Sequence, residues 1–422
     1  MKTLIKYDLK YYLSNRVKLM VALSFILSIF ATIFVYDFLE LTILPQEVVE
    51  LRSTAYSLQS LEYNLIREHE AEALKVMEAD PSTLSDKEKG LLAGLRGEIE
   101  TVKLFSLFDN LASQFSGGRL NVELTPYRYE INKELLVLID QIDPSYLEPI
   151  LPKLDLSENY LKAEQVRITS LMNSLTPDDI NQFTITQNNL AGKVLQGYAL
   201  IIAMVFVIFL YYDLFAKEYN QRTYQTLFSS PYPRKKIYIS KILFAIGYTL
   251  ALVLIAILLG SIYLALQTRV GYNVAPSRIG NIMHPMLMNI NPLTLFNMQP
   301  IYITVPLIVY NILSLTTGML LLSLWIIIMQ FIASKVRSSS NTLTMSLFGL
   351  LVIFFVGLFE VSDKLSVFIP FLAYRFNDNI SGLSSVNILV YLLVIIIYIV
   401  IGLRAYLFNV GKIDLLGGDH HD

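Results

Sequence analysis

The chain has 422 residues, of which 54% are hydrophobic and only 16% are charged, and its formal net charge is −2. Soluble domains carry about a quarter charged residues, so this composition excludes an ordinary soluble protein and predicts an integral membrane protein. The chain contains no cysteine, which excludes structural disulfides and thiolate metal sites.

The charged residues are unevenly distributed along the chain. Residues 37–195 contain 14 Lys and Arg against 26 Asp and Glu, a net charge of −12. The rest of the chain contains 19 against 9, a net charge of +10. We therefore expect one acidic, water-facing domain within a basic membrane body.

The first 16 residues are predicted to form a helix that lies in the headgroup region of the membrane. Apolar side chains recur at helical spacing, and lysines flank them: Ile5, Leu9, Tyr12 and Leu13, with Lys2, Lys6 and Lys10. The lysines of such a helix reach anionic lipid while its apolar side chains enter the membrane. An ordinary cytoplasmic lead-in to the first span is the alternative.

Six apolar runs predict six transmembrane helices, at about 19–36, 195–212, 242–266, 303–332, 341–359 and 386–403. A helix of 18 residues rises about 27 Å, which is enough to cross the hydrocarbon core. No small-residue cleavage pattern follows the first run, so we interpret it as a retained span. We predict an all-α polytopic membrane protein with a mostly helical extracytoplasmic domain inserted after the first span. The predicted divisions are an interfacial helix (1–16), the first span (17–36), the extracytoplasmic domain (37–194), the other five spans (195–406) and a tail (407–422).

Lys and Arg in the short flanking segments predict the orientation in the cell membrane. If both termini are cytoplasmic, the cytoplasmic side receives Lys2, Lys6, Lys10, Arg16, Lys18, Lys217, Arg222, Arg234, Lys235, Lys236, Lys241, Lys335, Arg337, Arg404 and Lys412. The short outer loops keep Arg269, Arg278, Lys364 and Arg375. This bias places both termini and the tail 407–422 in the cytoplasm and the domain 37–194 outside.

The outer segments differ in their predicted regularity. Within 37–194, Ser85 and Glu88 form a capping box, and Thr176-Pro177-Asp178 is typical of a helix start, whereas 120–152 reads as less regular and leaves room for short strands. Four prolines predict an irregular loop over 267–302. The apolar piece within 360–385 is too short to cross and is broken by Pro370, so we predict a re-entrant outer hairpin there.

The segment 213–241 joins the second and third spans and contains Pro231 and Pro233. Proline ends a helix and restricts the residue before it, so the segment reads as a helix, a break and a new helix that opens at Arg234. A short polar helix between two spans has nothing to bury within its own chain. We interpret it as a docking element for a separate cytoplasmic subunit.

The sequence lacks the residue patterns that several kinds of catalysis and binding require. There is no phosphate-binding loop, zinc-protease helix or assignable Ser/His/Asp set, so we predict no catalytic residue, no metal site and no cofactor in this chain. Basic residues lie along membrane flanks, which gives no support for nucleic-acid binding. The spans have essentially no ionisable side chain and read as uninterrupted helices, which argues against an ion-driven carrier.

The docking segment resembles the loop between the second and third spans of type-2 ATP-binding-cassette exporter permeases. The positions that match that family's pattern are Glu218, Thr223, Leu227, Pro231, Arg234 and Lys241, and Arg222 stands where the family has glycine. The layout is also similar, with an amphipathic N-terminal helix, six spans, a small-residue turn at 334–340 and a proline-containing outer hairpin.

The resemblance implies a half-transporter, in which two permease copies pair and each docks to an ATPase subunit that binds ATP and Mg. The implied docking residues are Glu218, Arg222, Thr223, Tyr224, Leu227, Phe228, Pro231, Arg234 and Lys241. Tyr224, Leu227 and Phe228 would form an apolar knob for the ATPase; an idle helix on the membrane surface is the alternative. Residues implied to bind the membrane surface are Lys2, Lys6, Lys10, Lys217, Lys235 and Lys236.

We expect the permease subunit of an ATP-driven exporter for a hydrophobic or amphipathic substrate such as a peptide, lipid or drug. The chain itself would not be an enzyme. A membrane-anchored receptor or scaffold, whose acidic outer domain binds a ligand, is the alternative from another class. One or two spans would suffice for such an anchor, and six are predicted.

Overall fold

The computed structural model describes residues 2–38, 190–195, 197–215, 233–267, 285–289, 302–358, 369–372 and 387–412, with isolated positions 133, 136, 137, 165 and 169. Nearly all of the predicted domain 37–194 therefore lies outside the described residues. The same holds for 216–232 of the docking segment, most of the hairpin 360–385, and the tail from residue 413.

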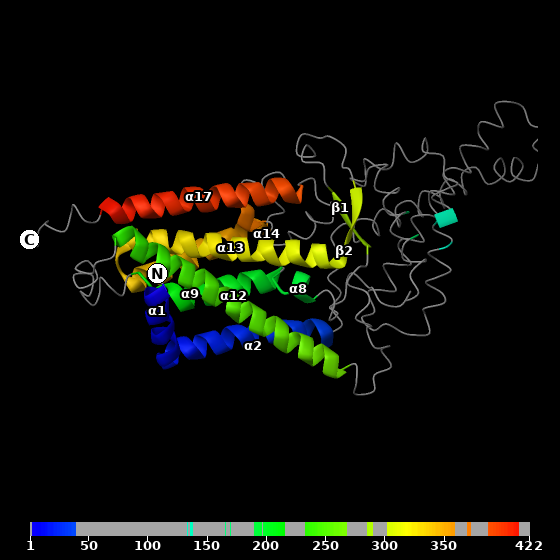
Figure 1. Ribbon diagram of the computed structural model, residues 1–422, viewed down its shortest axis with the longest axis horizontal. Coiled ribbons are helices and arrows are strands. Elements are labelled where there is room, and N and C mark those ends of the chain that lie inside the picture. The colour runs from blue at the N-terminus through cyan, green and yellow to red at the C-terminus, as the bar shows by residue number, and fades with distance from the viewer. Residues whose placement is uncertain are drawn as a thin grey trace, which may run out of the picture.

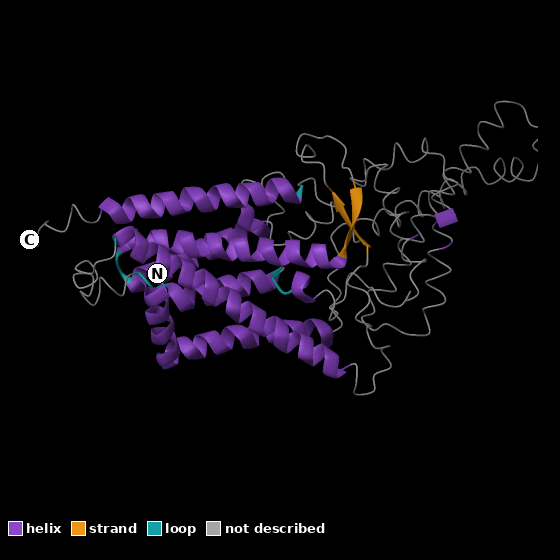
Figure 2. Cartoon of the chain, viewed as in Figure 1, coloured by secondary structure: helices purple, strands orange, loops and turns teal. Residues whose placement is uncertain are grey.

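The described elements are almost all helices (Figure 2). The helices are α1 (Lys2–Ser14), α2 (Arg16–Phe38), α8 (Leu190–Lys193), α9 (Tyr198–Tyr211), α12 (Arg234–Gln267), α13 (Leu307–Val336), α14 (Ser339–Leu358) and α17 (Ile388–Lys412). A 3₁₀ turn, η5, covers Pro370–Leu372, and two strands cover Pro285–Asn289 (β1) and Tyr302–Pro306 (β2).

Five of these helices are long and apolar enough to cross a membrane, namely α2, α12, α13, α14 and α17. The expected second span is present as the shorter apolar helix α9, which has 14 residues. The outward side of the long helices is apolar, as at Met20, Leu258, Phe348 and Ile401, which are all exposed. An apolar surface of this extent would be unfavourable in water, so it marks a multi-pass membrane protein.

Helix α13 occupies the centre of the bundle and packs against α8, α9, α12, α14 and α17 (Figure 1). Its neighbours approach closely where side chains are small. A Cβ atom on Gly318 would lie 2.8 Å from the Cβ of Leu195, a distance that real side chains essentially never show. Small residues allow helices in a membrane to approach in this way, because lipid tails give no hydrophobic drive for association.

Helix α1 crosses the end of the bundle instead of continuing α2 (Figure 1). The predicted helical structure of α1 is confirmed, but the residues of its predicted apolar face do not share one environment. Tyr12 is buried, whereas Leu9 and Leu13 are exposed. Lys6 and Lys10 are exposed as well. The face that Leu9 and Leu13 share therefore points away from the bundle, in line with a helix that contacts lipid.

The apolar stretch before the third span consists of two helical pieces, which corrects the expectation of uninterrupted helices. α8 ends at Lys193, and α9 begins after Gly197, whose φ of 56° is left-handed. Glycine takes this conformation without steric cost. The Ser314 hydroxyl of α13 donates a hydrogen bond to the Gly192 carbonyl, so the end of α8 is fastened to α13.

The segment 267–302 is not irregular throughout, and the fold is not purely helical. β1 and β2 pair antiparallel, from Pro285 opposite Pro306 to Asn289 opposite Tyr302. Both prolines lie at the margin of the two-stranded sheet, where a missing N–H is tolerated. Strand β2 also displaces the start of the fourth predicted span, which is α13, from the expected residue 303 to Leu307, with Pro306 as the residue before it.

The proline-containing turn η5 reaches between the helices. The Phe371 ring lies 5.4 Å from the Trp325 ring, which stands about 27 Å along α13 from its first residue. The Tyr391 hydroxyl of α17 donates a hydrogen bond to the Pro370 carbonyl. These contacts fit a re-entrant hairpin, which remains a prediction because most of 360–385 lies outside the described residues.

We predict that Gly318→Ala destabilises the protein by about 1–3 kcal/mol, because the new methyl group overpacks the contact with Leu195. The measure is the free energy of unfolding in mixed micelles titrated with SDS. Gly247→Ala in α12 is the matched control, since a Cβ there meets no atom within 4 Å. It should be neutral or stabilising, because alanine favours a helix by up to about 1 kcal/mol. Equal effects of the two substitutions would contradict the close approach.

Candidate functional site

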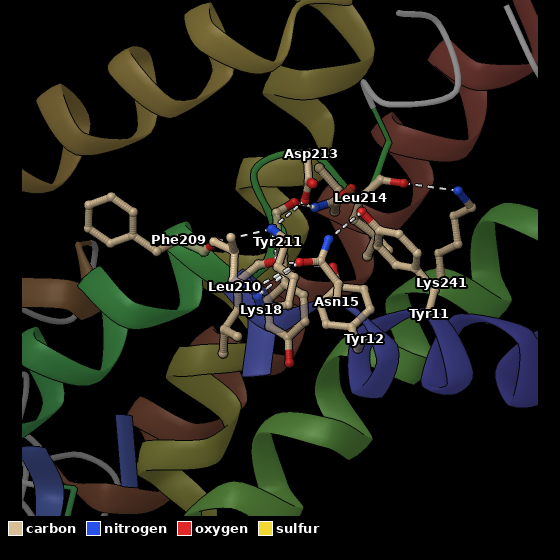
Figure 3. A network of polar contacts seen from close by, with 12 residues as sticks. Tyr11, Tyr12, Asn15, Lys18, Phe209, Leu210, Tyr211, Asp213, Leu214 and Lys241 are labelled. Carbon is tan, nitrogen blue, oxygen red and sulfur yellow. Dashed lines mark hydrogen bonds and ion pairs between the residues drawn. The ribbon is translucent and has the colours of Figure 1, made fainter. Parts of the chain in front are cut away.

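The candidate site is the C-terminal end of α9, from which the docking segment begins. The last four carbonyls of a helix have no partner within the helix. Here the Ile208 carbonyl accepts from the Tyr212 N–H at 2.9 Å. The carbonyls of Phe209, Leu210, Tyr211 and Leu214 accept from side chains of four other elements (Figure 3). We call these carbonyls, with Asp213 and the side chains that bind them, the α9 cluster.

Lys18 of α2 makes most of these bonds. Its Nζ lies 2.7 Å from the Leu210 carbonyl, 3.2 Å from the Phe209 carbonyl and 2.6 Å from Asp213 Oδ1. The Lys18 side chain is only 4% exposed and that of Asp213 16%. Its ammonium also lies 4.5 Å from the centre of the Tyr212 ring, within the range of a cation–π interaction. The positive charge is thus placed at the negative end of the α9 dipole.

Tyr12 of α1 binds the same turn. Its hydroxyl donates to the Leu210 carbonyl at 3.0 Å, and its ring packs against Phe244 of α12 at 5.0 Å. Burial raises the pKa of Tyr12 well above its ordinary value, and the nearby Asp213 carboxylate raises it further. The hydroxyl therefore keeps its proton at physiological pH and remains a donor.

Two further helices bind the cluster through buried side chains. Gln330 of α13 donates from Nε2 to the Tyr211 carbonyl at 3.0 Å. Lys241 of α12 is 5% exposed and donates from Nζ to the Leu214 carbonyl at 2.9 Å. The end of α9 is therefore bonded to α1, α2, α12 and α13.

The elbow between α1 and α2 is fixed beside the cluster by Asn15. Its Oδ1 accepts from the N–H groups of Val17 at 3.0 Å and Lys18 at 3.3 Å, as a helix N-cap does. Its Nδ2 donates to the Tyr11 hydroxyl at 3.0 Å. The elbow thus lies between Tyr12 and Lys18, which both bond the Leu210 carbonyl (Figure 3).

The two ends of the docking segment meet in an aromatic contact. Phe215, which follows α9, lies 5.1 Å from Tyr238 of α12 and 6.2 Å from Tyr406 of α17. α12 begins at Arg234, and the Pro233 carbonyl accepts from the Lys236 N–H at 2.8 Å. The predicted start of a new helix at Arg234 is therefore confirmed, whereas the helix and Pro231 expected before it lie outside the described residues.

Only part of the predicted docking set falls within the described residues. Lys217, Glu218, Arg222, Thr223, Tyr224, Leu227, Phe228 and Pro231 lie outside them. Arg234 is the first residue of α12, and Lys235 and Lys236 are exposed. Lys241 faces the α9 cluster and not the surface. Its position therefore favours a role in supporting the base of the docking segment.

Sequence reasoning did not identify Lys18, Asp213, Tyr12 or Gln330 as members of one site. The signal that was present is a pair of opposite charges at the ends of the first two apolar runs, Lys18 and Asp213. Charges that flank spans usually face water, so this pair had an ordinary explanation.

We predict that Lys18→Met lowers the free energy of unfolding by about 3 kcal/mol, because it leaves Asp213 and two carbonyls without their cation. Asp213→Asn should cost less, since Lys18 keeps the carbonyls. The double variant should lose less than the sum of the single losses. SDS titration measures all three, with Lys10→Met as an exposed control that should change little. Additive losses would contradict the coupling of Lys18 to Asp213.

The comparisons with known proteins agree with this architecture. The sequence profile described as ABC-2 family transporter protein matches residues 3–411 of the chain. Neither a curated protein nor a solved structure shows significant similarity to it. The match spans nearly all of the chain, including every helix of the bundle. The chain belongs to the ABC-2 family of membrane transporter proteins.

Proposed function

We propose that this chain is the membrane permease subunit of an ATP-driven exporter, and that a separate ATP-binding-cassette subunit hydrolyses ATP with Mg and docks on the segment 213–241. The family consists of membrane transport components that generally work with such an ATPase and are not themselves catalytic. The observation that carries the proposal is the α9 cluster. It joins four elements to the turn from which the docking segment begins, so a force applied to that segment reaches most of the bundle.

The apolar knob that enters the ATPase consists of Tyr224, Leu227 and Phe228. Further docking residues surround it, namely Glu218, Arg222, Thr223, Pro231 and Arg234. Lys241 supports the base of the docking segment. Lys2, Lys6, Lys10, Lys217, Lys235 and Lys236 bind the anionic inner leaflet, where each basic residue contributes about 1 kcal/mol. The exposed positions of Lys6, Lys10, Lys235 and Lys236 support this part of the proposal.

The proposal includes the orientation and the assembly of the chain. Both termini lie in the cytoplasm, the domain 37–194 lies outside the cell, and two permease copies pair across the substrate path. The basic flanks at the end of the bundle where α1 lies support this orientation. The substrate is hydrophobic or amphipathic, because the described helices offer apolar surface.

Co-purification tests the docking proposal. The double substitution Leu227→Asp with Phe228→Asp should weaken retention of the ATPase roughly 30-fold, since loss of an interface hot spot costs about 2 kcal/mol. Gln225→Glu is the matched control, because it adds an acidic group within the same segment and leaves the knob unchanged.

Purification of the unaltered chain without any ATPase, under several conditions, would contradict the exporter. It would favour the receptor or scaffold. In that case, deletion of residues 37–194 would abolish all function, whereas an exporter keeps coupled ATP hydrolysis. Equal retention of the ATPase by the knob variant and the control would remove the knob from the docking site.

A further inference from the structure

We infer that Lys18 is a positioning residue that makes the first span, α2, move together with α9 when the ATPase acts on the docking segment. The inference rests on the proposed function and adds a path by which motion of the docking segment reaches α2. Without Lys18, motion of the α9 cluster would reach α2 only through Tyr12 and the elbow and through the packing of α2 against α9.

The bias of basic residues toward the cytoplasmic side explains a lysine at this end of the first span, but it does not explain why Lys18 is buried. It is the third residue of α2, and the helix dipole disfavours a cation in the first turn of a helix. Its burial adds a further desolvation cost. Both costs are offset by carbonyls of α9 and by Asp213, which lies two residues beyond its end, so the lysine serves the contact between α2 and α9.

The acceptors of Lys18 determine what the contact transmits. Two of its three bonds go to the main-chain carbonyls of Phe209 and Leu210, and the third goes to Asp213. Main-chain acceptors cannot swing away as a side chain does. A shift of the α9 backbone at this turn therefore displaces the Lys18 ammonium, and with it the start of α2.

A bond from α1 to the same turn of α9 reinforces the contact between α2 and α9. Tyr12 shares the Leu210 carbonyl with Lys18, and Asn15 fixes the elbow between the two side chains. α1 and α2 are thus attached to α9 as one unit with two bonds to one carbonyl. Gln330 and Lys241 attach α13 and α12 to neighbouring carbonyls, and neither bond involves α2.

Spin-label distances in the complex of the full chain with its co-purifying ATPase test the inference. The chain has no native cysteine, so introduced cysteines are labelled without background. One pair, Met20→Cys with Phe355→Cys, reports α2 against α14, and a second, Phe209→Cys with Phe355→Cys, reports α9 against α14. These three side chains are exposed, by 65%, 51% and 39% for Met20, Phe355 and Phe209. Distances are measured with and without ATP, Mg²⁺ and vanadate.

We expect ATP to shift both distances in the parent protein. Lys18→Met should reduce the shift of α2 and retain the shift of α9, because the Tyr12 bond and the packing of α2 against α9 remain. Lys18→Arg keeps a cation with several donors and should restore the shift of α2. Asn409→Leu removes the buried bond between Asn409 of α17 and Ser334 of α13, outside the α9 cluster, and it should retain both shifts, which separates transmission from general destabilisation. Asp213→Asn, which spares the carbonyl bonds, should reduce the shift of α2 in a fully folded protein.

The outcomes separate this inference from the proposed function. Retention of the α2 shift in Lys18→Met and in Asp213→Asn would overturn the inference and leave the exporter standing. Loss of both shifts in Lys18→Met would also overturn it, because Lys18 would then be needed for α9 itself. If ATP shifts neither distance in the parent, the proposed function fails and this inference fails with it.

Discussion

The arrangement of the bundle depends on how the carbonyl end of α9 is satisfied. A helix end buried among other helices needs donors, and here each donor comes from a different element. Lys18 contributes a full positive charge where the α9 dipole is negative, and Asp213 neutralises the part of that charge that the dipole does not balance. The bonds tie residues that are nearly 200 positions apart in sequence to one turn of backbone. The same turn is the root of the segment on which the partner subunit is proposed to act.

Helix α13 provides the fixed centre against which the other helices are placed. It is buried over most of its length, and three of its buried polar residues contact neighbouring helices. Ser314 holds α8, Gln330 holds the end of α9, and Ser334 bonds with Asn409 of α17 at 2.6 Å. In a membrane, where apolar packing between helices has no hydrophobic drive, such polar contacts and the close approach at Gly318 specify which helix lies beside which.

The sequence predicted the long helices well, because a span must be apolar over its whole length. α12 contains its predicted apolar run, α14 and α17 cover theirs except at one end, and the helix start at Arg234 followed from the two prolines. The interruption at Gly197 and the pairing of β1 with β2 depend on tertiary contacts, which a linear pattern does not contain. Lys18 and Asp213 are separated by 195 positions, so no periodicity brings them together. The docking residues were found only through the resemblance, and those at 216–232 remain predictions.

The left-handed glycine between α8 and α9 has a mechanical consequence. Ser314 fastens α8 to α13, Leu195 is wedged against Gly318, and the α9 cluster fastens the other end of α9. Gly197 lets the backbone change direction between these two attachments, in a left-handed conformation that a residue with a Cβ rarely adopts. The second crossing is therefore anchored on both sides of its bend, and displacement of one anchor is resisted by the other.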